Sequence, residues 1–112
     1  MFQVLKSTTQ KICEQNHIRW HIGRNFSIDT IFAQFAYIDE IIGMGCNTIE
    51  METASAFRAA TISNISLAAL FSVLDNTMLN KSLYSGRTLE DIKYRKEVQK
   101  NIFPEIILEV LK

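Results

Sequence analysis

The chain has few residues that break secondary structure or form cross-links, and it has no excess of charge of either sign. It has one proline, four glycines and two cysteines in 112 residues. Cys13 and Cys46 have neither metal-ligand nor redox spacing, which predicts reduced, packed thiols, no metal site and a cytoplasmic protein. Twelve basic and twelve acidic residues cancel. We therefore expect no nucleic-acid partner and no anionic membrane surface bound through bulk charge.

Long apolar runs are also missing. The uncharged stretches are too short and too interrupted by polar residues for a membrane span, and the first residues lack the basic start and apolar core of a signal peptide. A content of 47% hydrophobic and 21% charged residues is typical of a globular protein. The length predicts a single domain over 1–112, or part of one.

Helical and strand-like patterns alternate along the chain. Apolar residues at helical spacing predict helices over 4–16, 32–44 and 53–63. A last helix begins at a capping box at Thr88 and is expected to be kinked or split at Pro104. Alternation or short apolar runs predict strands near 18–23, 46–51 and 65–73. This order favours an α/β fold with a largely parallel central sheet and helices on both sides.

Two carboxylates follow two of these strand-like segments. Glu52 comes just after the strand expected at 46–51, and Asp75 comes 23 positions later, after the apolar run 65–73. Ligands of open α/β sheets bind beyond the carboxyl ends of the strands. The pair therefore predicts a small-molecule site.

Three segments in this order resemble the nucleoside phosphorylase family, which includes hexameric purine nucleoside phosphorylases, uridine phosphorylase and methylthioadenosine nucleosidases. They are Gly23–Thr30, Glu50-Met51-Glu52 and Leu74-Asp75. The resemblance runs from about Ile18 to the C-terminus and implies a partial three-layer phosphorylase-like fold with a mixed, largely parallel sheet. Family members are more than twice as long, and the chain resembles their C-terminal portion. Their Gly-rich phosphate loop and phosphate-binding arginine, which lie upstream, have no counterpart here.

The resemblance implies a ribose-binding role for Glu50, Met51 and Glu52. Glu52 would accept hydrogen bonds from the 2′- and 3′-hydroxyls, because an ionised carboxylate has about four acceptor sites. Its charge would favour an oxocarbenium-like transition state, while Met51 packs against the sugar. The alternative is that Glu50 and Glu52 only cap the helix that follows.

On the base side, the resemblance makes Asp75 the general acid that donates near N7 of a departing purine, which requires a raised pKa. A turn residue in Asp75-Asn76 is the alternative. Leu74 stands where the family has serine. Ile31 occupies the base-stacking position, where the family has an aromatic ring, so either Phe32 takes over that role or it packs in the core.

Two arginines compete for the family's catalytic-loop arginine, Arg87 and Arg95, and either could be a solvated charge. The implied activity is reversible phosphorolysis of purine nucleosides, with phosphate as co-substrate and no cofactor. The alternatives are a nucleosidase that uses water, or a catalytically incomplete fragment that serves in binding or assembly. We expect a homo-oligomer or a complex with an N-terminal half.

Overall fold

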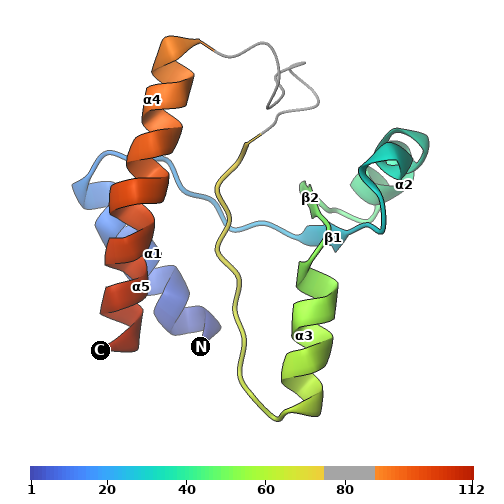
Figure 1. Ribbon diagram of the computed structural model, residues 1–112, viewed down its shortest axis with the longest axis horizontal. Coiled ribbons are helices and arrows are strands. Elements are labelled where there is room, and N and C mark those ends of the chain that lie inside the picture. The colour runs from blue at the N-terminus through green and yellow to red at the C-terminus, as the bar shows by residue number, and fades with distance from the viewer. Residues whose placement is uncertain (75–87) are drawn as a thin grey trace. The chain divides into compact units, whose positions relative to one another are not determined.

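The computed structural model describes residues 1–74 and 88–112 (Figure 1). These residues form helices and a two-stranded parallel sheet, which confirms the α/β class in broad outline. In chain order the elements are α1 (Phe2–Gln15), β1 (Asn25–Ser27), η1 (Ile31–Ala33), α2 (Gln34–Gly43), β2 (Thr48–Glu50), α3 (Thr53–Ile62), α4 (Leu89–Glu97), the π-helical turn η3 (Val98–Ile102) and α5 (Phe103–Leu111). The helices expected at 4–16, 32–44 and 53–63 are confirmed as α1, η1 with α2, and α3.

The chain divides into two compact units. The central unit consists of His21–Ala69 together with Met1, and it contains the sheet, α2 and α3. The terminal unit consists of Phe2–Trp20 and Leu70–Lys112, and it contains α1, α4, η3 and α5.

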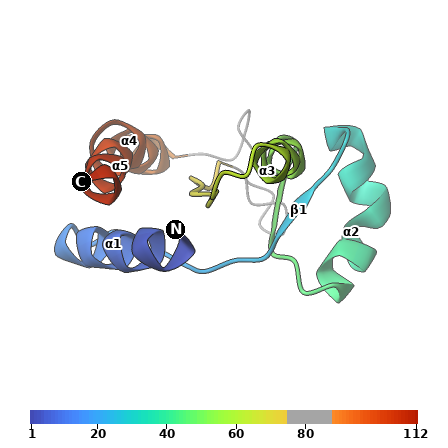
Figure 2. The same ribbon diagram turned by 90° about the horizontal axis from the view of Figure 1, so that it is seen from below.

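The terminal unit is held by apolar packing between α1 and α5, which run side by side (Figures 1 and 2). Ile12 and Cys13 of α1 meet Ile102 and Ile106 in a buried cluster. Leu5, Ile18, Trp20, Leu70 and Val110 are partly buried against it. Burying an isoleucine side chain fully contributes about 1.5–3 kcal/mol, so this cluster stabilises the packing of α1 against η3 and α5.

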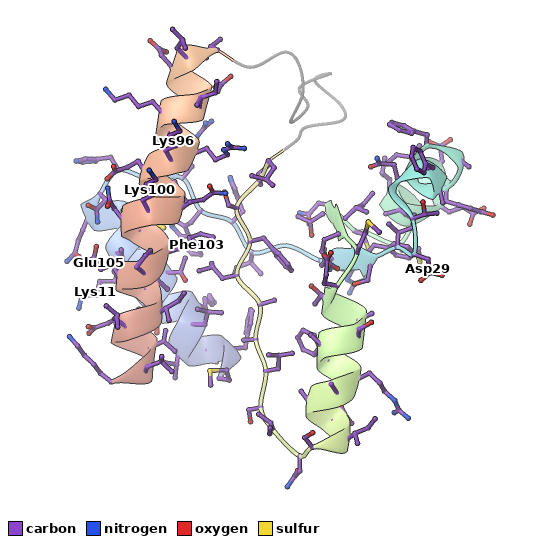
Figure 3. All side chains as sticks on the ribbon, in the orientation of Figure 1. Lys11, Asp29, Lys96, Lys100, Phe103 and Glu105 are labelled. Atoms are coloured by element: carbon purple, nitrogen blue, oxygen red, sulfur yellow. The ribbon has the colours of Figure 1, made fainter. Side chains whose placement is uncertain are left out.

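The C-terminal helices begin at the expected capping box. The Asp91 N–H donates to Thr88 Oγ1 at 3.1 Å, and the Thr88 N–H donates to Asp91 Oδ2 at 3.2 Å. Exposed Lys96, Lys100 and Glu105 project from the outer side of these helices, while Phe103 is half-buried (Figure 3).

Pro104 perturbs the helix without splitting it. A proline has no N–H to donate to the carbonyl four residues earlier, and here the turn before it widens into η3, where the Phe103 N–H bonds the Val98 carbonyl. A π-helical turn is a recognised way for a helix to absorb such a lost bond. The perturbation expected at Pro104 is therefore present as a widened turn.

In the central unit, β1 and β2 pair in parallel, with Asn25 opposite Thr48, Phe26 opposite Ile49 and Ser27 opposite Glu50. β2 confirms the strand expected near 46–51. Parallel strands need a crossover connection, and η1 with α2 provides it. The parallel strand–helix–strand unit thus consists of β1, α2 and β2, and not of the segments 46–51, 53–63 and 65–73.

Three helices, α1, α2 and α3, end in the same way, at a sharp turn of the chain. His17, Gly45 and Asn64 have φ values of 56°, 78° and 55° and follow α1, α2 and α3. In each case the next residue donates its N–H to the carbonyl five positions earlier, at 2.8, 3.3 and 2.9 Å. This is the Schellman arrangement, which requires a left-handed residue just beyond the helix.

Two predicted strands are wrong. The segment 18–23 forms no strand, because Ile18 and Trp20 pack against the helical cluster and the Arg19 N–H donates to the Tyr94 hydroxyl at 3.0 Å. β1 instead begins at Asn25.

The apolar run 65–73 also forms no strand in the described part of the chain. Leu70 is partly buried against the helical cluster, whereas Ile65 and Val73 are exposed. A continuous apolar run predicts burial, but strand pairing also needs a neighbouring strand edge. No described strand pairs with this run, so the strand predicted at 65–73 is wrong.

Candidate functional site

The candidate site lies at the turn from β2 to α3. Glu50 ends β2, Thr53 begins α3, and Met51 and Glu52 connect them. Glu50 is half-buried, whereas Glu52 is exposed and Met51 is 46% exposed. The three residues of the predicted ribose-binding segment therefore stand at the carboxyl end of a parallel strand pair, where ligands of such sheets bind.

Four donors surround the Glu50 carboxylate. Its Oε1 accepts from Asn25 Nδ2 at 2.6 Å and from the Ser27 hydroxyl. Its Oε2 accepts from the backbone N–H groups of Glu52 and Thr53, both at 2.6 Å. A carboxylate has about four acceptor sites, so protein groups alone occupy those of Glu50.

These bonds decide the ionisation of Glu50. Burial raises the pKa of its carboxyl, but the hydrogen bonds from Ser27, Asn25, Thr53 and Glu52 together outweigh that effect and lower the pKa to about 2. Hydrogen bonds donated to the charged form favour it. Glu50 is therefore an anion throughout the physiological pH range.

The side chains that bind Glu50 are themselves held. Thr48 Oγ1 donates to Asn25 Oδ1 at 2.9 Å, which directs the Asn25 amide nitrogen to Glu50. The Ala54 N–H donates to Ser27 Oγ at 2.9 Å, which leaves the hydroxyl proton for Glu50. We call Asn25, Ser27 and Glu50 the strand-end network.

The helix-capping alternative therefore applies to one glutamate and not to the other. Glu50 binds the Glu52 and Thr53 N–H groups at the start of α3, which would otherwise lack partners. The Glu52 side chain makes no capping bond. Its Oε2 accepts one bond, from the adjacent Met51 N–H at 3.2 Å. Glu52 thus keeps most of its acceptor capacity for another molecule.

The residues expected to meet the base lie in the same unit as Glu52. Ile31 and Phe32 form the first turn of η1, after the loop that follows β1 and carries Asp29 (Figure 3). The Phe32 side chain is 84% exposed, so it is not a core residue here. Its N–H donates to Thr30 Oγ1 at 3.3 Å.

Of the predicted general acid and the two candidate arginines, the structure describes only Arg95. Asp75 and Arg87 lie outside the described residues. Arg95 lies on α4 in the terminal unit, half-buried, with a buried Nε that finds no hydrogen-bond partner in the described structure. Glu50, Met51, Glu52, Ile31 and Phe32 share the central unit, and Arg95 does not.

Sequence reasoning missed the polar residues that build the turn. Asn25 and Ser27 alternate along β1 and are in register with Thr48 and Glu50 of β2. The period-two pattern Asn-x-Ser opposite Thr-x-Glu was the available signal, because residues two apart on a strand share a face.

Arg24 is also structural. Its guanidinium donates to the Met44 carbonyl at 2.9 Å, beyond the end of α2, and its N–H donates to Asn47 Oδ1 at 3.0 Å. Gly23 allows this approach, since a Cβ there would lie 2.7 Å from the same Asn47 oxygen. These contacts fix the chain entering β1 against the chain entering β2.

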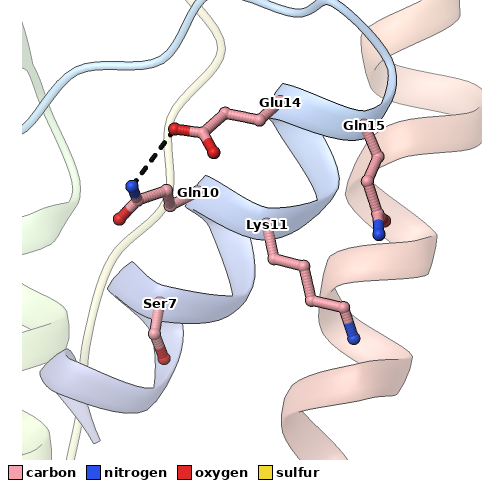
Figure 4. Close-up of a pocket in the computed structure, with 5 residues that line it drawn as sticks. All are labelled: Ser7, Gln10, Lys11, Glu14 and Gln15. Atoms are coloured by element: carbon pink, nitrogen blue, oxygen red, sulfur yellow. Dashed lines mark hydrogen bonds between the residues drawn. The ribbon is translucent and has the colours of Figure 1, made fainter.

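A shallow hollow on α1 holds none of the candidate residues. Ser7, Gln10, Lys11, Glu14 and Gln15 line it (Figure 4). All five are exposed residues of a single helix, and Gln10 Nε2 donates to Glu14 Oε1 at 3.1 Å. Such a surface offers no enclosure for a small molecule.

The described residues hold no cluster of three His, Cys, Asp or Glu side chains suited to a metal ion. Nor does any helix among them have the length and apolar content needed to cross a membrane. Comparisons of the chain with protein-family models, with curated proteins and with solved structures find no match.

Proposed function

We propose that the chain is part of a purine nucleoside phosphorylase-like glycosyltransferase and carries the sugar-binding and base-binding side of its active site. In this proposal the central unit belongs to a three-layer phosphorylase-like fold. The reaction is reversible phosphorolysis of the N-glycosidic bond of a purine nucleoside, with phosphate as the second substrate.

The observation that carries the proposal is the difference in hydrogen bonding between Glu50 and Glu52. Glu50 is saturated by protein donors, while Glu52 is exposed and makes no capping bond. A carboxylate held at a strand end with free acceptor sites suits two adjacent ribose hydroxyls. Glu50 is correspondingly reassigned from direct ribose contact to support of the turn.

The chemistry follows from charge. As the glycosidic bond breaks, the sugar gains positive character, and the Glu52 carboxylate stabilises that charge. The exposed Met51 thioether offers a flexible apolar contact to the sugar face. Exposed Phe32 offers its ring to the base, and Ile31, the residue before it in the chain, belongs to the same base-binding segment. Asp75 acts as general acid to the base, and Arg87 or Arg95 approaches that acid.

Two alternatives use the same residues. A nucleosidase would direct water to the sugar instead of phosphate. An incomplete fragment would bind nucleoside, or join a polypeptide that supplies the phosphate loop, without catalysis of its own. In a homo-oligomer, a second copy of the chain could supply residues that complete the site.

The test is hypoxanthine release from inosine, measured with and without phosphate. It is run on the chain alone and on the chain mixed with a polypeptide that supplies a Gly-rich phosphate loop. Phosphate-dependent release supports the proposal, and equal release without phosphate favours the nucleosidase. Saturable inosine binding without release in either mixture favours the fragment. Neither binding nor release at about millimolar inosine, the weak end of specific affinity, overturns all three.

A further inference from the structure

The strand-end network joins three segments at the start of α3. Asn25 and Ser27 come from β1, Glu50 from β2, and the recipients of its second oxygen are backbone N–H groups of the β2–α3 turn. None of these side chains is fully exposed. The network therefore fixes a connection that has only two residues, Met51 and Glu52, between strand and helix.

The bonds leave little freedom for the turn to rearrange. The first N–H groups of a helix have no partner within the helix. Here the Glu52 and Thr53 N–H groups bond Glu50, and the Ala54 N–H bonds Ser27. The carbonyl of Glu50 is held as well, because it accepts from the Ile28 N–H at 2.9 Å. Glu52 is thus tied through its backbone while its side chain stays exposed.

We propose that Asn25 and Ser27, acting through Glu50, are positioning residues for Glu52 and set the affinity of the site for a nucleoside without touching it. This inference rests on the proposed function. A binding group held in one geometry loses less freedom when its ligand arrives, so loosening the turn weakens binding even though the Glu52 carboxylate is retained.

Ser27 is the sharpest place to test this role. Ser27→Ala removes the donor to Glu50 and the acceptor for the Ala54 N–H together. Ser27→Thr keeps the hydroxyl and suits a strand. Ser55→Ala is the matched control, because Ser55 is an exposed serine in the first turn of α3 that takes no part in the strand-end network.

Two measurements distinguish an effect on the strand-end network from an effect on ligand binding. Amide hydrogen exchange at Thr53 and Ala54 reports the turn without any ligand. We expect Ser27→Ala to speed it at least about tenfold, because the substitution removes two hydrogen bonds. Isothermal titration with inosine reports the site, and we expect affinity to fall about tenfold. Ser27→Thr should restore both values, and Ser55→Ala should change neither.

Each result that differs from these expectations rules out a specific part of the proposal. Unchanged exchange in a folded Ser27→Ala variant overturns the network. Faster exchange with unchanged inosine affinity makes Ser27 purely structural and leaves the proposed function standing. If Ser27→Ala does not fold, Asn25→Ala takes its place. It removes a donor to Glu50 alone, so we expect faster exchange at Thr53, whose N–H bonds Glu50, and weaker inosine binding; unchanged exchange at Thr53 overturns the network. Failure of the unmodified chain to bind inosine, both alone and mixed with the phosphate-loop polypeptide, removes the proposed function, and this inference with it, whatever the exchange rates show.

Discussion

Replacing Glu50 by glutamine tests the structural half of the account. The change keeps the size of the side chain but removes its charge, and an amide NH₂ must then face either the Asn25 and Ser27 donors or the Glu52 and Thr53 N–H groups. A pKa lowered from 4.5 to about 2 corresponds to about 3 kcal/mol of stability at neutral pH, at 1.36 kcal/mol for each pKa unit. Because the residue is only half-buried, solvent screening reduces our expectation to about 1–2 kcal/mol.

The pH dependence has a definite sign. The folded-state pKa of Glu50 lies below its ordinary value, so the unfolded chain takes up the proton more readily. The contribution of Glu50 is therefore complete above about pH 4.5 and is lost as the pH falls toward 2. The difference in stability between the wild type and Glu50→Gln should shrink over the same window.

Amide exchange at Glu52 and Thr53, combined with urea unfolding, measures both effects. The matched control is Glu40→Gln, since Glu40 is an exposed carboxylate on α2 in the same unit. We expect exchange at the turn to accelerate in Glu50→Gln and to stay unchanged in Glu40→Gln. Equal stability loss in the two variants, or a difference that persists at pH 2, would refute the reasoning.

Three further predictions concern activity and assembly. In a phosphorolytic complex, Asp75→Asn should lower turnover of purine nucleosides roughly 10²–10⁴-fold, the usual range for a general acid; near-wild-type turnover would rule out that role. One of the two substitutions Arg87→Gln and Arg95→Gln should lower turnover, while the other leaves turnover at the wild-type value. If neither lowers turnover, neither arginine has the catalytic role. The chain should self-associate in light scattering, because Ile41 is the one buried apolar side chain among the described residues of the central unit and the small sheet has open edges; a stable monomer at all concentrations would contradict this.

The elements that sequence predicted well are those set by local chemistry. The helices follow from apolar spacing, and the Thr88 capping box formed with Asp91 in place of the usual Glu or Gln. β2 sits where a short apolar segment precedes Glu50-Met51-Glu52. In these cases the pattern and its partner lie within a few residues of each other.

The strand predictions are wrong where the structure of a segment depends on which distant part of the chain it packs against. Alternation predicts Trp20 as a strand residue, but Trp20 packs on a helical cluster. Alternation alone cannot show which surface receives a side chain. The run 65–73 predicted burial without identifying a neighbouring strand. For the site, the motif located Glu52 and Met51, whereas Asn25 and Ser27 emerged only from the register of β1 on β2.

The central claim is that the Glu52 carboxylate receives the two ribose hydroxyls, and a binding cycle tests it most directly. Inosine and 2′,3′-dideoxyinosine are titrated by calorimetry into the wild type, Glu52→Gln and Glu40→Gln. A hydrogen bond to a charged group contributes about 1.5–3 kcal/mol, so the wild type and Glu40→Gln should prefer inosine by at least about tenfold. Glu52→Gln should lose most of that preference. An equal preference for inosine in all three proteins would contradict the account.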